Sequence, residues 1–180
     1  MSDPIGDPDA ADVARCRDGD RGAFDEIVRR HQSTLRRLVK RYVPPDDVED
    51  VLQRTFERAF EKLDTFRGAS LLRTWLFRIA VNTALNHVRA TPPERNLELE
   101  EIPVFTQSLQ TSKLVAAEVW RKVSGLLEEL PPKQRLVLEL RAFHELSFDE
   151  IAAVAECSED SAKANYHHAI KRLRGLIPEL

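Results

Sequence analysis

The sequence has few of the features on which active sites, disulfide frameworks and membrane spans depend. It contains only 6 glycines and 2 cysteines among 180 residues, with no glycine-rich phosphate loop and no nucleophile–base constellation. No apolar run approaches the roughly 20 residues of a membrane helix, and the polar, acidic N-terminus does not have the pattern of a signal peptide. We therefore expect a cytoplasmic protein without membrane insertion that is not an enzyme and binds no cofactor.

The cysteines and histidines are spaced too widely to form a metal site. Cys16 and Cys157 have no partner cysteines, and none of the five histidines has a metal-ligand spacing to them. We expect both cysteines to stay reduced and metal-free. The charge balance is slightly acidic, with 27 lysines and arginines against 30 aspartates and glutamates. The hydrophobic fraction of 42% is sufficient for the core of one domain or of two small ones.

Helical periodicity dominates and no strand-like alternation is convincing, so the sequence predicts an all-α fold. Helices are expected across 9–43, with a break at 19–22 and a stop at Pro44-Pro45, and then across 48–63 and 70–89. The helix at 48–63 is expected to bury an apolar face that consists of Leu52, Phe56, Ala59, Phe60 and Leu63.

Composition changes after these helices. Residues 92–112 contain prolines and four glutamates but only one arginine, and they show no amphipathic period. We interpret them as an acidic linker that joins two small helical domains, at 9–91 and 113–180. Helical patterning resumes near Lys113 and again at Pro131-Pro132, since proline suits the first turn of a helix.

The C-terminal domain has the pattern of a helix-turn-helix. Ser147 precedes Glu150 by three residues, the spacing of a capping box, which predicts a helix from about Phe148. A short polar turn follows at 156–158, and Ser158 can cap a second helix. Two helices joined by so short a turn predict a helix-turn-helix whose second helix enters the major groove of DNA.

This second helix, at 161–176, is basic and contains no acidic residue; its cations are Lys163, Lys171, Arg172 and Arg174. In an acidic chain, a locally basic helix indicates a surface that binds phosphate. An ordinary solvated helix whose basic last turn complements the helix dipole would have the same composition. The pattern by itself leaves both interpretations open.

Four motifs follow one another along the chain. They are GDRGAFDEIVRRH at 19–31, DDVEDVLQRTF at 46–56, a group at 66–82 that includes Phe66-Arg67-Gly68 and Arg73-Thr74-Trp75-Leu76, and the segment 130–173. In this order and spacing the chain resembles the bacterial RNA polymerase sigma factors of the sigma-70 family. The resemblance is greatest to the compact extracytoplasmic-function (ECF) group, and it covers about 9–176.

The resemblance implies a sigma factor that directs RNA polymerase to specific promoters and aids the initiation of transcription. Its implied partners are core RNA polymerase, promoter DNA and an anti-sigma factor. The implied polymerase-binding residues are Asp47, Glu49, Asp50, Gln53 and Phe56. The residues implied to face the −10 element are Phe66, Arg67, Arg73, Arg78, Asn82, Asn86 and Arg89. Those implied to face the −35 element are Ser161, Lys163, Asn165, His167, His168, Lys171 and Arg172.

Two residues depart from the usual family pattern. Glu156 stands in the tight turn where glycine is usual, and it needs a backbone conformation that is costly for glutamate. Asn165 stands where arginine is common. Because asparagine pairs best with adenine, we expect one −35 position to favour adenine.

Several interpretations stay open beside this one. Phe66 and Trp75 fit a core as well as a base pocket, and the core is favoured for Trp75. Asn82 fits either a buried hydrogen bond or a base contact. For the whole chain, the first alternative is a conventional helix-turn-helix DNA-binding transcriptional regulator, in which DDVEDVLQRTF would have no use. The second is a decoy that sequesters an anti-sigma factor, which would not need both DNA-facing helices.

Overall fold

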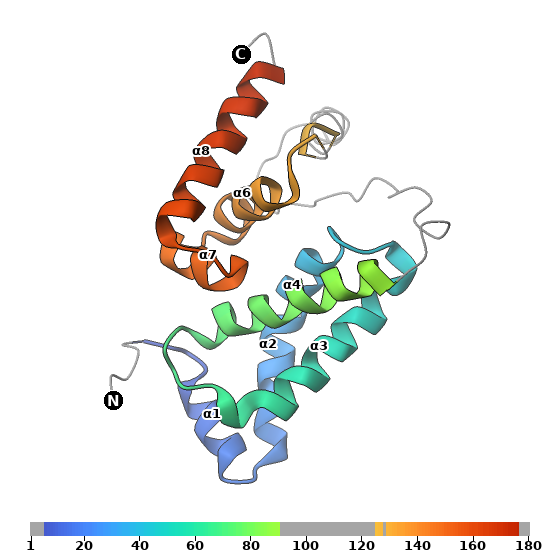
Figure 1. Cartoon of the computed structure of the whole chain (residues 1–180). Coiled ribbons are helices and arrows are strands. Elements are labelled where there is room, and N and C mark those ends of the chain that lie inside the picture. The colour runs from blue at the N-terminus through green and yellow to red at the C-terminus, as the bar shows by residue number, and fades with distance from the viewer. Residues whose placement is uncertain (1–5, 91–124, 128, 177–180) are drawn as a thin grey trace, which may run out of the picture. The chain divides into compact units, whose positions relative to one another are not determined.

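The computed structural model of the chain describes residues 6–90, 125–127 and 129–176 (Figure 1). The chain divides into two compact units, 1–100 and 101–180. The described residues are largely helical and contain no β-strand, which confirms the predicted all-α class. The predicted linker at 92–112 and the helical pattern predicted near Lys113 lie outside the described residues.

In the N-terminal unit the helices are α1 (Ala10–Arg17), α2 (Arg21–Val39), α3 (Val48–Lys62) and α4 (Leu72–Ala90). Short 3₁₀ turns, η1 (Pro45–Asp47) and η2 (Leu63–Thr65), lie on either side of α3. The predicted break between α1 and α2 is confirmed. Gly19 makes this turn at a φ of +93°, and the Asp20 side chain caps α2 by accepting a hydrogen bond from Gly22 N at 3.0 Å.

Helices α2, α3 and α4 pack against one another, and α1 packs along α2 (Figure 1). The side chains that are at most 1% exposed come from all three long helices; they include Ile27, Leu35, Leu38, Val51, Leu76 and Phe77. Burial of these apolar faces fixes the rotation of each helix, so the polar faces of α3 and α4 are held toward solvent.

The predicted burial of Phe60 was wrong. Its side chain is 47% exposed, and its ring makes an edge-to-face contact with the Phe24 ring, with 5.0 Å between the centroids. The buried stripe of α3 runs through Leu52, Phe56 and Ala59. Phe60 is one residue beyond Ala59 and therefore about 100° further around the helix, at the margin of that stripe.

In the C-terminal unit the helices α6 (Pro132–His144), α7 (Phe148–Ala155) and α8 (Glu159–Leu176) all pack on one another. One core cluster consists of Leu127, Leu130, Leu138 and Ala169, with Phe143, Tyr166, Ile170 and Leu173 around it. This cluster holds one side of α8 against α6, so the opposite side of α8 is available to solvent.

Candidate functional site

The turn between α7 and α8 has the geometry of a helix-turn-helix. The predicted capping box is confirmed: Glu150 Oε2 accepts from Ser147 N at 2.9 Å, and Ser147 Oγ accepts from Glu150 N at 3.4 Å. Glu156 ends α7 in the left-handed region, at φ 51° and ψ 53°, as its position in the turn predicted. Ser158 Oγ then accepts from Ser161 N at 3.2 Å and begins α8.

The start of α8 is occupied by hydrogen bonds and ion pairs within the helix. Lys163 Nζ lies 2.7 Å from Glu159 Oε1, and this pairing raises the pKa of Lys163. Asn165 Nδ2 donates to the Ser161 carbonyl oxygen at 2.8 Å, and its residue is half-buried. A contact between Asn165 and a base edge therefore competes with this hydrogen bond to the helix backbone.

The later residues of α8 are different, because their side chains are exposed; these are His167, His168, Lys171 and Arg172. A hollow of about 490 Å³ lies beside them. It is lined by His168, Lys171, Arg172 and Gly175 of α8 and by Gln134 of α6. Gln134 Oε1 is buried there and has no hydrogen-bond partner among the residues that the structure describes. The far part of α8 is thus a cationic surface that the helix itself does not neutralise.

The predicted polymerase-binding residues lie on α3 and the turn before it. Glu49, Asp50 and Gln53 are exposed, Asp47 is half-buried, and Phe56 is buried in the core with an exposure of 9%. Phe56 therefore belongs to the core, whereas Glu49, Asp50 and Gln53 face solvent.

Each polar member of this face has a partner inside the unit. Asp47 Oδ2 lies 2.9 Å from His87 Nε2, and Glu49 Oε1 lies 2.7 Å from an Arg36 guanidinium nitrogen. Asp50 pairs with Arg54 at 3.0 Å. Gln53 Nε2 donates to Glu57 Oε1 at 2.8 Å. A docking partner must offer cations that compete with the exposed ion pairs of Glu49 and Asp50, each of which contributes only about 0–1 kcal/mol.

Seven residues were predicted to face the −10 element, and the structure places them at different depths. Phe66 is only 6% exposed, and its ring packs against Trp75 with 5.4 Å between the centroids. Arg73 and Asn82 are half-buried. The exposed members are Arg67, Arg78, Asn86 and Arg89. In this conformation Phe66 packs within the loop, whereas the side chains of Arg67, Arg78 and Arg89 are exposed to solvent.

Sequence analysis missed a cleft between α3 and α4. It has a volume of about 420 Å³ and is lined by Arg54, Arg58, Thr83, Asn86, His87 and Ala90. Arg58 Nη1 donates to Thr83 Oγ1 at 3.1 Å, which fixes the guanidinium at the cleft. The signal in the sequence was the spacing of Arg54 and Arg58, four residues apart on one face of α3.

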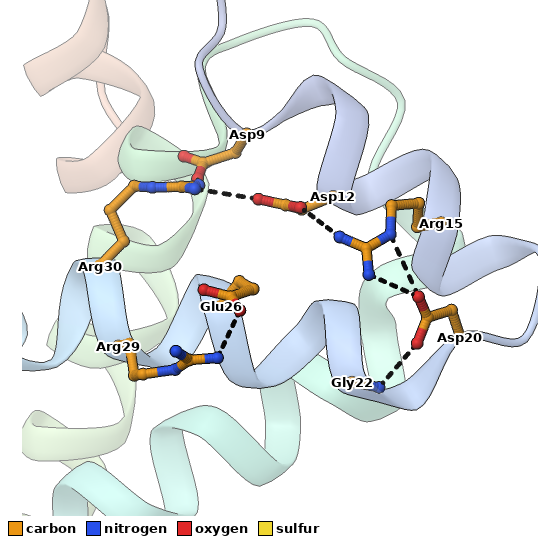
Figure 2. A network of polar contacts seen from close by, with 8 residues as sticks. All are labelled: Asp9, Asp12, Arg15, Asp20, Gly22, Glu26, Arg29 and Arg30. Carbon is orange, nitrogen blue, oxygen red and sulfur yellow. Dashed lines mark hydrogen bonds and ion pairs between the residues drawn. The ribbon is translucent and has the colours of Figure 1, made fainter.

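A chain of carboxylates and guanidiniums joins α1 to α2, and sequence analysis missed this network too (Figure 2). Arg30 bridges the carboxylates of Asp9 and Asp12, with Asp12 Oδ2 at 3.0 Å. Arg15 in turn bridges Asp12 and Asp20, at 3.2 and 2.6 Å. Asp12 and Arg15 are three residues apart on α1, but Arg30 is 21 and 18 residues from Asp9 and Asp12, so no local pattern predicted the link between the two helices.

Asp9 is the buried member of this network. Its carboxylate also lies 2.8 Å from His31 Nε2. Burial by itself raises the pKa of Asp9, but the hydrogen bonds and charges of His31 and Arg30 outweigh burial and hold the pKa below its ordinary value. Asp9 therefore stays ionised at neutral pH and ties the beginning of α1 to the middle of α2.

Cys16 and Cys157 are both free, and burial raises the pKa of the Cys16 thiol. In the part of the chain that the structure describes, no group of three or more histidine, cysteine, aspartate and glutamate side chains could hold a metal ion. Among the same residues, no helix is both long enough and apolar enough to span a bilayer.

Comparison with known sequences identifies both halves of the chain. The family models for sigma-70 region 2 and sigma-70 region 4 match residues 27–91 and 120–173. Proteins named ECF RNA polymerase sigma-E factor from Salmonella typhimurium (strain LT2) and Escherichia coli (strain K12) are 36% identical over 178 residues, which is 93% of each chain. The protein of that name from Haemophilus influenzae is 31% identical over 96% of both chains.

Solved structures show the same architecture. The structure of CnrH in complex with the cytosolic domain of CnrY matches with a TM-score of 0.71 at 27% identity, over 94% of this chain and 97% of that one. The sigma factor RpoE in complex with the anti-sigma factor NepR from Bartonella quintana matches with a TM-score of 0.68 at 23% identity, over 86% and 96%. The second likeness is evidence for the fold alone.

Proposed function

This chain belongs to the sigma-70 family, in its ECF group, and on that premise we propose that it directs core RNA polymerase to specific promoters and helps to initiate transcription there. It acts by binding and not by catalysis, in the cytoplasm where the polymerase works. The observation that carries the proposal is a helix-turn-helix with a cationic α8 in the same chain as the acidic exposed face of α3. A conventional regulator of the helix-turn-helix type would use only the first of these.

We assign the two functions to separate domains. Residues 9–91 bind the polymerase and recognise and melt the −10 region, residues 113–180 recognise the −35 element, and the acidic residues 92–112 link them. The two family models fall within these domains, at 27–91 and 120–173, which supports the division.

Polymerase docking is the role of the polar face of α3. Glu49, Asp50 and Gln53 are exposed side by side on this helix, and Asp47 lies in the turn just before it. Carboxylates at the rim of an interface set partner specificity and association rate more than affinity. Phe56 supports the face from the core and is not itself in contact with the polymerase.

Promoter melting is the role of the loop after η2 and of α4. The exposed Arg67, Arg78 and Arg89 hold phosphates of the non-template strand, and Asn86 offers an amide to base edges. Phe66 packs on Trp75 and shapes the loop beneath the strand. Arg73 and Asn82 are half-buried and make a smaller contribution to strand binding.

Recognition of the −35 duplex is the role of α8. Its N-terminal part, with Ser161, Lys163 and Asn165, faces the bases, because that part of a recognition helix enters the groove most deeply. Its far part holds phosphates through His167, His168, Lys171 and Arg172, which are exposed. The hollow beside α6 allows a phosphate to approach Lys171 and Arg172 together.

An anti-sigma factor is the proposed inhibitory partner. The solved structures of the sigma factor RpoE and of CnrH each contain a second protein, which for RpoE is named an anti-sigma factor. A protein that covers α3 or α8 would prevent polymerase docking or −35 binding.

The experiment that tests polymerase docking is a titration of core RNA polymerase with labelled full-length chain. We expect Asp50→Lys to weaken binding by about tenfold, because a reversed charge meets the basic surface that the carboxylate would meet. Asp25→Lys is the matched control, since Asp25 is exposed on α2 and outside the proposed interface. Both variants should keep the helical circular dichroism of the wild type.

Run-off transcription on genomic fragments then separates the function from its rival. The proposed function requires that wild-type chain plus core enzyme yields discrete transcripts that core enzyme alone does not. A chain that binds DNA without core enzyme, shows no affinity for core, and yields no transcripts is a conventional regulator, and the proposal would be abandoned.

A further inference from the structure

Residues ahead of α1 reach across the N-terminal unit to the start of α4. Asp7 Oδ2 accepts a hydrogen bond from Leu72 N at 2.8 Å, although the two residues are 65 positions apart. Asp7 Oδ1 accepts from Asp9 N at 3.0 Å. One carboxylate therefore satisfies main-chain donors at the beginnings of both α1 and α4, where its charge also suits the positive end of each helix dipole.

The other end of the same loop is held from α1. Arg17, in the last turn of α1, donates from its guanidinium to the main-chain carbonyl of Phe66. The loop from Phe66 to Leu72 is thus attached at its first residue by Arg17 and at its last by Asp7. Between these two points lie the exposed Arg67 and Gly68, whose φ of +68° is accessible to few residues other than glycine.

Both attachments rest on a rigid base. Asp9, two residues after Asp7, is buried and is bound by Arg30 and His31 of α2. The chain of ion pairs continues through Asp12 to Arg15, two residues before Arg17 (Figure 2). The beginning and end of α1 are therefore fixed to α2, and α1 in turn fixes the loop.

We propose that Asp7 and Arg17 are positioning residues, which hold the loop 66–72 in the shape that captures the −10 non-template strand. This inference rests on the proposed function. Both residues precede the segment at 27–91 that the region 2 model matches. Without the two attachments the loop would sample more conformations, and ordering it would oppose strand binding.

The test uses holoenzyme assembled from core RNA polymerase and full-length chain. The probe is a single-stranded oligonucleotide with the non-template −10 sequence of a promoter that wild-type holoenzyme transcribes, and a second probe has the same bases scrambled. The variants are Asp7→Ala and Arg17→Ala. Their matched controls are Asp18→Ala and Arg21→Ala, which remove the same charges from exposed positions nearby.

We expect Asp7→Ala and Arg17→Ala each to weaken binding of the −10 probe about fivefold, in line with the loss of one helix cap by Asp7 and of one hydrogen bond from a charged donor by Arg17. Binding of the scrambled probe, binding of core enzyme and binding of −35 duplex should stay unchanged, so the ratio between the two probes falls. Asp7→Asn keeps one acceptor oxygen but no charge, and it should recover part of the ratio.

Three results would overturn the inference. The first is an unchanged probe ratio in both alanine variants. The second is an equal loss for both probes together with weaker core binding, since that is the result of a merely destabilised fold. In the third, wild-type holoenzyme does not discriminate the probes, which removes the proposed −10 function and this inference with it. The first two leave the proposed function standing.

Discussion

The predicted base contact of Asn165 has to compete with a hydrogen bond that the structure shows. Asn165 lies near the start of α8, where a recognition helix contacts base edges, but its Nδ2 donates to the Ser161 carbonyl oxygen at 2.8 Å. A bidentate contact to adenine needs Oδ1 and one N–H of Nδ2 turned toward the base, and this reorientation competes with the bond to Ser161.

The free energy gained from the base contact and the free energy of the bond to Ser161 are of similar size. A good bidentate contact discriminates by about 1–3 kcal/mol against the wrong base. The bond to Ser161 contributes about 1 kcal/mol, which is the net value of an ordinary hydrogen bond within a protein. The difference leaves about 0–2 kcal/mol, equivalent to at most about 30-fold preference for adenine at one position. We therefore expect a real but moderate preference.

The assay is selection from a promoter library randomised at the −35 element, with wild type, Asn165→Ala and Asn86→Ala. Asn165→Ala should lose the preference for adenine at one position and keep the others. Asn86→Ala is the matched control, because Asn86 is on α4 in the other unit and should leave −35 preferences unaltered. Identical base preferences from wild type and Asn165→Ala would refute base reading by Asn165, whose role would then be the bond to its own helix.

Two further predictions concern stability, measured by urea unfolding. Glu156→Gly should stabilise the C-terminal unit by about 1 kcal/mol, because glycine adopts the left-handed turn without strain, whereas Glu156→Ala should not. Asp9→Asn should destabilise the N-terminal unit by about 2–3 kcal/mol at pH 7, less than a fully buried pair because Arg30 is partly exposed. The folded pKa of Asp9 lies below its ordinary value of 3.8, so the wild type should keep its greater free energy of unfolding above about pH 4 and lose it as the pH falls further. A stability difference between wild type and Asp9→Asn that does not shrink on acidification would contradict this assignment.

The sequence predicted the helix-turn-helix closely because every determinant of it is local. The capping box joins residues three positions apart, and Ser158 caps the helix that begins at the next residue. The resemblance to the family, which usually has glycine in this turn, assigned Glu156 to the left-handed position, and the structure places it there. Such interactions depend on spacing along the chain and not on the fold.

Prediction was weaker where a helix face had to be divided between core and solvent. Periodicity correctly indicated one apolar stripe on α3, but it could not define the edge of that stripe. Phe60 was placed inside it and is exposed, and Phe56 was grouped with the polar docking residues although it is buried. The width of a buried stripe depends on how closely neighbouring helices approach, which the sequence of one helix does not contain.

The N-terminal acidic residues show a different kind of limit, because their partners are distant in sequence. From composition they were only a polar, negatively charged beginning of the chain. In the structure Asp7 caps a helix 65 residues away, and Asp9 binds the side chain of His31, 22 residues away. Motif matching favours residues inside the matched segments, and here it directed attention to Phe66 and α4. The residues that hold Phe66 and α4 in place, Arg17 and Asp7, lie outside those segments.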